Sequence, residues 1–235
     1  RQWLNTRANG RRCVPITLRE SNIKPERNSD LRVWAEIAQR LQSAGYFPFI
    51  IRDIDKACEA LPLEFKEIHS CPEAAFNLEL RMALYEESHI CAFVSNGPVN
   101  ACYYNRNVQY LYFQTGNWLN SNPPWHYREG IGVGRTPPFA NHFQKWVWRS
   151  QDADTFMDEI ITMDNQIEQS RADGSYESKL DLNVENREPF EKLAKRFSNF
   201  PNTHLNTEHK LMFECISDGD PIRITKKKER NRIDS

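Results

Sequence analysis

Short apolar runs alternate with amphipathic segments along the first two thirds of the chain. The runs occur at residues 13–18 (CVPITL), 47–51 (FPFII), 91–94 (CAFV) and 108–113 (VQYLYF). Between the first two, in residues 31–46, apolar positions recur every three or four residues. Strand-like runs separated by helix-like segments are typical of a parallel sheet with crossover helices. We therefore expect an α/β fold, with a Rossmann-like parallel sheet and helices on both of its faces.

The same spacing predicts two more helices, over residues 77–89 and 151–169. In the first, Leu78, Met82 and Tyr85 share one face. In the second, one face carries Phe156, Ile160, Met163 and Ile167. Each apolar face is wide enough to cover part of a sheet.

The limits of this pattern suggest a division of the chain into three parts. The repeating pattern spans residues 13–169, which we expect to form one domain. Residues 1–12 are expected to be a linker or the remnant of a preceding segment. After Gly174 the composition becomes polar, so residues 170–235 predict a mainly helical C-terminal extension. Within the domain, residues 114–149 are rich in Pro, Gly and aromatic residues and predict a long ordered loop with a short element at its end.

Composition narrows the class of protein. The 31 basic and 32 acidic residues leave a formal charge of −1, which does not favour binding to nucleic acid. The six cysteines include no CxxC pair and three lie in apolar runs, as expected of reduced thiols in an intracellular protein. No apolar stretch approaches the roughly 20 residues of a transmembrane helix. We expect a cytoplasmic protein without a transmembrane segment.

Candidate chemistry begins with Ser95, Asn96, Gly97 and Pro98, where the apolar run CAFV stops. Ligands of a doubly wound sheet bind beyond the carboxyl ends of its strands. Gly97 would let a backbone approach a ligand, and Pro98 suits the first turn of a helix over VNACYY. The turn therefore predicts a phosphate or diphosphate site, although an ordinary tight turn explains the same residues.

Charged residues follow two other predicted strands and would meet this turn at the same edge of the sheet. Arg19 and Glu20 end the first strand, and Asp53 ends the second. Arg19 suits a phosphate, and an acidic residue suits ribose hydroxyls. On the helix over residues 77–89, Arg81 and Glu86 are candidate contacts to a base or ribose, but for Arg81 a solvated surface charge is the simpler interpretation.

Taken together, these segments resemble a known family. The order TLRE, LRVWAEIAQRLQSAGY, FPFIIRD, NLELRMALYEESH and CAFVSNGPVNACYY is similar to the donor-binding half of GT-B glycosyltransferases, and most of all to heptosyltransferases. Gly97 and Pro98 match the motif of that family, whereas Ser95 and Asn100 stand where it has Asp and His. The likeness covers residues 13–165, and its specific part is the Gly-Pro turn.

The resemblance implies a nucleotide diphosphate sugar as donor, transfer of its sugar to an acceptor, and no essential metal or other cofactor. The diphosphate would lie at Ser95–Pro98 and Asn100 with Arg19 and Glu20. The acceptor would be held by an N-terminal domain that is not seen in this sequence, and the catalytic base is not identified.

Two alternatives of other classes remain open. One is a noncatalytic ligand-binding or assembly domain with the same fold, and the other is a sugar-nucleotide epimerase. His126 and His142 are candidate bases, but a structural role explains them more simply. The sequence contains no Walker A, GxSxG or HExxH motif, which argues against the corresponding nucleotidase and hydrolase classes.

Overall fold

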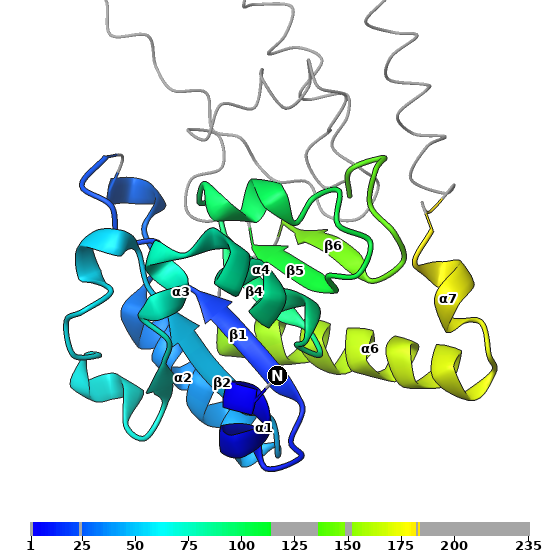
Figure 1. The fold of residues 1–235 in the computed structure, drawn as a ribbon, viewed down its shortest axis with the longest axis horizontal. Coiled ribbons are helices and arrows are strands. Elements are labelled where there is room, and N and C mark those ends of the chain that lie inside the picture. Colours follow the sequence, from blue (N-terminus) through cyan, green and yellow to red (C-terminus); the bar gives the residue numbers. More distant parts are fainter. Residues whose placement is uncertain (1, 24, 114–135, 149–151, 182, 184–235) are drawn as a thin grey trace, which may run out of the picture.

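A six-stranded parallel sheet forms the centre of the computed structural model, which describes residues 2–23, 25–113, 136–148, 152–181 and 183 (Figure 1). Its strands are β1 (Cys13–Thr17), β2 (Phe47–Ile51), β3 (His69–Ser70), β4 (Cys91–Val94), β5 (Tyr110–Phe113) and β6 (Gln144–Val147). The strand order is β3-β2-β1-β4-β5-β6, and every neighbouring pair is parallel. This is the order of a doubly wound Rossmann-like sheet, which confirms the predicted fold class.

Helices cover both faces of the sheet (Figure 1). The α-helices are α1 (Gln2–Ala8), α2 (Leu31–Ser43), α3 (Glu73–Phe76), α4 (Leu78–Glu86), α6 (Ala153–Ala172) and α7 (Tyr176–Lys179). Short 3-10 helices are η1 (Pro25–Arg27), η2 (Ile54–Lys56), η3 (Leu63–Phe65) and η4 (Pro98–Ala101). One buried cluster joins α2 and α6 to the first face, and a second joins α1, α3 and α4 to the other.

The helix α2 forms where the spacing of apolar residues predicts it. The side chain of Asp30 accepts hydrogen bonds from the backbone N–H groups of Arg32 and Val33, which caps the first turn. Trp34 and Leu41 are buried on its inner face, and Trp34 makes an edge contact with Phe156 of α6 (5.5 Å between ring centroids). Gly45 follows the helix in the left-handed region (φ +88°), a conformation that favours glycine.

The helix α6 is also as predicted, because all four residues of its expected apolar face are buried. In α4, by contrast, the inner face was predicted only in part. Tyr85 is buried, but Leu78 is 54% exposed and Arg81 is turned inward. The nine-residue helix follows β3, and Leu78 and Leu80 in its first turn are both exposed.

The compact unit extends beyond the expected bounds of 13–169. Within the expected linker 1–12, residues of α1 pack on the sheet through Leu4 and Ala8. At the other end, Leu180 after α7 joins the core. The predicted helical extension beyond 183 and the loop region 114–135 with His126 lie outside the described residues.

Two general expectations concern thiols and membranes. The five cysteines in the described part of the chain are all free thiols. Among the described helices, none combines the length and apolar character required to cross a bilayer.

Candidate functional site

A pocket of about 260 Å³, lined by both charged and apolar side chains, lies at the carboxyl edge of the sheet. It is formed by the loops after β1, β2 and β4 together with the start of α4. The chain turns toward opposite sides of the sheet after β1 and β4, so the pocket lies at the topological switch point of the fold. Six residues proposed from the sequence line it, namely Arg19, Asp53, Arg81, Asn96, Gly97 and Pro98.

Arg19 projects from the loop after β1 and is held there by its neighbours. Its backbone N–H donates to Ser29 Oγ (3.0 Å), and one terminal nitrogen of its guanidinium donates to the carbonyl of Ile23 (2.6 Å). Its Nε is buried and has no hydrogen-bond acceptor among the residues that the structure describes. Arg19 is therefore oriented by the loop while part of its donor capacity is unused.

Glu20 does not line the pocket, contrary to the expectation that it contacts the ligand. Its carboxylate accepts two hydrogen bonds from the buried guanidinium of Arg52, at 2.7 and 2.5 Å. This bond and the negative charge of Glu20 raise the pKa of Arg52 against the opposing effect of burial. The charge of Glu20 is thus used within the protein to join the loops after β1 and β2.

The acidic residues that do line the pocket follow β2. Asp53 Oδ2 accepts a hydrogen bond from the backbone N–H of Glu20 (2.7 Å), and Asp55 is exposed two residues further on in η2. Both carboxylates lie on the β2 side of the pocket, whereas Asn96 follows β4. The pocket therefore has an acidic side, which can accept hydrogen bonds from hydroxyl groups, and a side that carries hydrogen-bond donors.

The turn at Ser95–Pro98 differs from its expected form. It opens a four-residue 3-10 helix, η4, and not an α-helix. So short a segment aligns few peptide dipoles, and its N-terminus cannot provide the anion site that the sequence suggested. Gly97 has ordinary helical angles (φ −60°, ψ −49°), and a Cβ there would meet no atom within 4 Å. The glycine is thus not required by backbone strain or by a close contact within the protein.

Three further residues of this turn have distinct roles. Asn96 is 9% exposed; its Oδ1 accepts from the backbone N–H of Val99 (3.2 Å), while its Nδ2 is buried without an acceptor in the described ranges. Ser95 Oγ accepts a hydrogen bond from Arg27 and does not line the pocket. Asn100 is exposed and also lies off the pocket, with its backbone N–H bonded to the carbonyl of Gly97 (3.1 Å).

Arg81 reaches the pocket from α4 and is only 3% exposed. The preferred interpretation of a solvated surface charge was therefore wrong. Its Nε donates to the carbonyl of Ala74 (2.6 Å), which turns the guanidinium toward the edge of the sheet. One turn further along α4, the buried Tyr85 hydroxyl lies 2.7 Å from Thr17 Oγ1 at the end of β1. Burial raises the pKa of Tyr85, so the phenol stays protonated and links α4 to β1.

Glu86 lies at the far end of α4, near the start of β1, and accepts a hydrogen bond from Asn105 Nδ2 (2.7 Å). It is therefore at the opposite edge of the sheet, too far along the helix for the predicted role of ligand contact. His142 is exposed beside β6 and does not line the pocket either.

Sequence reasoning missed Arg27 and the pair of Thr17 and Tyr85. Arg27 belongs to a polar loop and follows no strand, so neither periodicity nor position distinguishes it from solvated neighbours. Thr17 and Tyr85 have apolar neighbours, and only their contact in three dimensions reveals a polar link.

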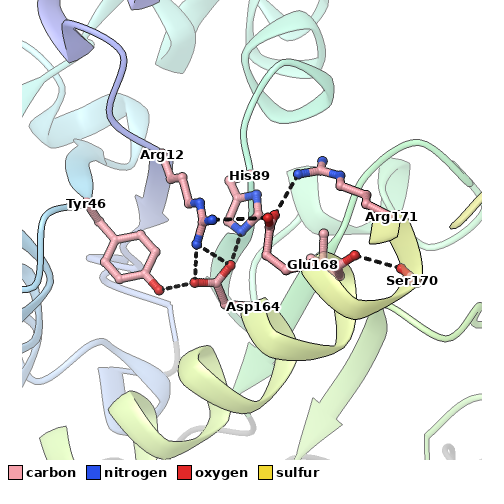
Figure 2. Close-up of polar contacts among 8 residues, drawn as sticks. Arg12, Tyr46, His89, Asp164, Glu168, Ser170 and Arg171 are labelled. Carbon is pink, nitrogen blue, oxygen red and sulfur yellow. Dashed lines mark hydrogen bonds and ion pairs between the residues drawn. The ribbon is translucent and has the colours of Figure 1, made fainter. Parts of the chain in front are cut away.

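A second polar cluster lies at the amino edge of the sheet, where Asp164 of α6 is the common acceptor (Figure 2). Arg12 before β1 donates to both of its oxygens (2.7 and 2.6 Å). Tyr46 before β2 donates its hydroxyl (2.5 Å), and His89 before β4 contacts it through Nε2 (2.7 Å). One carboxylate thus connects α6 to the entrances of three strands.

The charged groups in this cluster compensate one another, since Arg12 pairs with the carboxylates of Asp164 and Glu168. Burial alone would raise the pKa of Asp164, but the hydrogen bonds from Tyr46 and His89 and the charges around it keep that pKa below its usual value. Burial lowers the pKa of His89, which favours the neutral ring. Ligand atoms of His89, Asp164 and Glu168 lie within 4.8 Å of one another, as in some metal sites. Arg12 contacts both carboxylates, however, so the positive charge that a cation would supply is already present.

We therefore take the pocket at the carboxyl edge as the candidate functional site, and the amino-edge cluster as a structural clamp. Comparison with protein families, with curated proteins and with solved structures finds no match to this chain.

Proposed function

We propose that this domain binds the nucleotide diphosphate sugar of a GT-B glycosyltransferase, from which the sugar is transferred to an acceptor. One observation carries the proposal: residues from three separate strand ends and α4, selected from the sequence as donor contacts, line a single pocket at the switch point. Nucleotides commonly bind at this position of a doubly wound sheet.

The polarity of the pocket supports a particular orientation of the ligand. The diphosphate lies toward Arg19 and Asn96, where donors are available, and a hydroxyl-bearing ring lies toward Asp53 and Asp55. The cavity of about 260 Å³ is slightly smaller than pockets that enclose a drug-sized ligand, which span about 300–1,000 Å³. It therefore accommodates one end of a nucleotide sugar, and the rest of the ligand extends beyond it.

The chemistry that this arrangement supports is stabilisation of a leaving group. When the bond between the sugar and the diphosphate breaks, negative charge grows on the departing phosphate oxygen. A guanidinium already oriented by its own hydrogen bonds stabilises that charge without the cost of reorganisation. Arg19 is oriented in this way by Ile23 and the backbone bond to Ser29.

The test is calorimetric titration of the whole chain with a panel of nucleoside diphosphates and their sugar conjugates. We expect selective binding of one nucleotide and an affinity loss of about tenfold or more in Arg19→Ala, because a charge-assisted bond to phosphate is removed. Arg32→Ala is the control, since Arg32 is exposed at the start of α2 and does not line the pocket. Absence of binding by every nucleotide, or equal affinity in Arg19→Ala, contradicts the proposal.

The two carboxylates also support an epimerase as a second candidate. Such an enzyme needs acid and base groups near the sugar, and Asp53 and Asp55 both line the pocket. Product analysis separates the two reactions. An epimerase alters the nucleotide sugar without an acceptor, whereas a transferase releases the nucleoside diphosphate.

A further inference from the structure

Arg81 is unusual because its charge is buried without a counter-charge. Arg81 is 3% exposed and lines the pocket, and its only hydrogen bond among the described residues is the bond from Nε to the carbonyl of Ala74. In the described part of the chain, no carboxylate forms an ion pair with it. Taking a charge out of water is unfavourable unless a partner compensates it.

The arrangement of Arg52 provides a comparison within the same protein. Its guanidinium is equally buried at the same edge of the sheet, but Glu20 neutralises it through two hydrogen bonds. The fold is therefore able to supply a carboxylate for a buried arginine here. At Arg81, which lines the pocket, the fold supplies no such carboxylate from the described residues.

Two further donors at the same pocket, Nδ2 of Asn96 and Nε of Arg19, are buried and find no acceptor within the described part of the chain. An unsatisfied buried donor destabilises the folded protein, so native proteins seldom retain several at one place. Buried donors without acceptors in the loops after β1 and β4, beside the guanidinium of Arg81 from α4, indicate a ligand with several anionic oxygens.

We infer that Arg81, with Asn96 and Arg19, forms an anion subsite that binds a phosphate group by itself, without a contribution from the nucleoside. A tetrahedral phosphate offers oxygens in several directions and suits donors from three separate elements, whereas a planar carboxylate suits a single fork. The inference deepens the proposed function. It rests on that function only for the identity of the molecule that carries the phosphate.

The structure also explains how Arg81 is positioned. Its Nε is tied to Ala74, and the next turn of α4 is tied to β1 by the hydrogen bond between Tyr85 and Thr17. The guanidinium therefore faces the pocket before a ligand arrives. Pre-orientation of this kind reduces the loss of side-chain entropy on binding.

The experiment uses inorganic pyrophosphate, which carries the phosphate chemistry without a nucleoside. The full chain is titrated calorimetrically, and we expect pyrophosphate to bind the unmodified protein. Arg81→Gln and Asn96→Asp should each weaken binding by about tenfold or more, because the first removes the charge and the second replaces an unsatisfied donor with an anion of the same shape. Arg81→Lys should give an intermediate affinity, since it keeps the charge without the planar fork.

Arg32→Gln is the control for charge, because it removes one exposed positive charge from the start of α2 without altering the pocket. It should leave the affinity for pyrophosphate within about twofold, as expected for a solvent-screened charge. Thermal unfolding and near-UV circular dichroism establish that each variant is folded. If Arg81→Gln does not fold, Arg81→Lys and Asn96→Asp supply the comparison.

The outcomes separate this inference from the proposed function. The subsite is overturned if Arg81→Gln and Asn96→Asp both bind pyrophosphate as tightly as the unmodified protein does. It is also overturned if the unmodified protein does not bind pyrophosphate. If pyrophosphate binding depends on Arg81 but no nucleoside diphosphate binds selectively, the subsite stands and the glycosyltransferase proposal fails. If a nucleotide sugar binds equally well to Arg81→Gln, the donor-binding role stands and the subsite is overturned.

Discussion

At the scale of single residues, the two edges of the sheet treat charge differently. At the amino edge, Asp164 receives three donors and its charge is fully compensated. At the carboxyl edge, the charge of Arg52 is compensated by Glu20. The charge of Arg81 has no carboxylate partner, and the amide nitrogen of Asn96 has no acceptor, among the described residues. Sequence position alone does not distinguish these arginines, because both lie near apolar residues. The distinction arises from which carboxylate the fold brings within reach.

This difference predicts a large loss of stability when Arg52 loses its partner and a small loss when Arg81 loses its charge. Glu20→Ala leaves Arg52 buried and unpaired, and should lower the free energy of unfolding by about 3–5 kcal/mol. Arg81→Met removes a charge that is already unpaired and should cost only the bond to Ala74, about 1 kcal/mol. Urea denaturation in phosphate-free buffer measures both. A loss in Arg81→Met as large as that in Glu20→Ala would indicate that Arg81 is mainly structural.

At the scale of elements, the sequence predicted the strands that are continuous apolar runs and the helices whose apolar residues recur at helical spacing. The strands β1, β2, β4 and β5 are continuous apolar runs, and α2 and α6 have one apolar face each. By contrast, α1 buries only Leu4 and Ala8 among polar residues, too few for a period. The four residues Gln144–Val147 form a strand only because they pair with β5. The inward orientation of Arg81 could not be predicted. Its partner is the backbone carbonyl of Ala74, and every residue type has such a carbonyl.

The cap of α4 offers a test at this scale, since that helix carries Arg81. Asn77 Oδ1 accepts from the backbone N–H of Leu80 (2.9 Å), and Asn77→Ala should reduce stability by about 1 kcal/mol. We also expect weaker pyrophosphate binding, because the first turn of α4 positions the guanidinium. Asp30→Ala removes the equivalent cap of α2 and is the matched control. It should cause a similar loss of stability in denaturant titration without weakening pyrophosphate binding.

At the scale of the whole molecule, the amino-edge clamp couples stability to pH. In the folded state the pKa of His89 lies below its ordinary 6.5, and that of Asp164 below its ordinary 3.8. Both groups therefore bind protons more tightly when the protein is unfolded, and acid favours unfolding. Tyr46 has the opposite sign, because burial and then its bond to Asp164 raise its pKa from 10.0 to about 12.

The expected profile follows from these signs. Stability should fall as the pH drops below about 6.5 and again below about 3.8, and at the alkaline end it should fall as the pH rises from about 10 to 12. Chemical denaturation across this range measures the profile. His89→Gln retains a donor for Asp164 but does not titrate, so the first acid step should disappear. Persistence of that step in His89→Gln would assign it to another group.

The position of Asp164 also bears on the smallest part of this chain that can fold alone. A fragment ending before α6 would keep Arg12, Tyr46 and His89 at the strand entrances but lose the carboxylate that receives them. A fragment beginning at β1 would lose the cover that Leu4 gives to one face, and one ending at 169 would lose Leu180. Truncation that removes α1, or that ends before Leu180, should therefore lower the free energy of unfolding, because part of the buried core loses its cover.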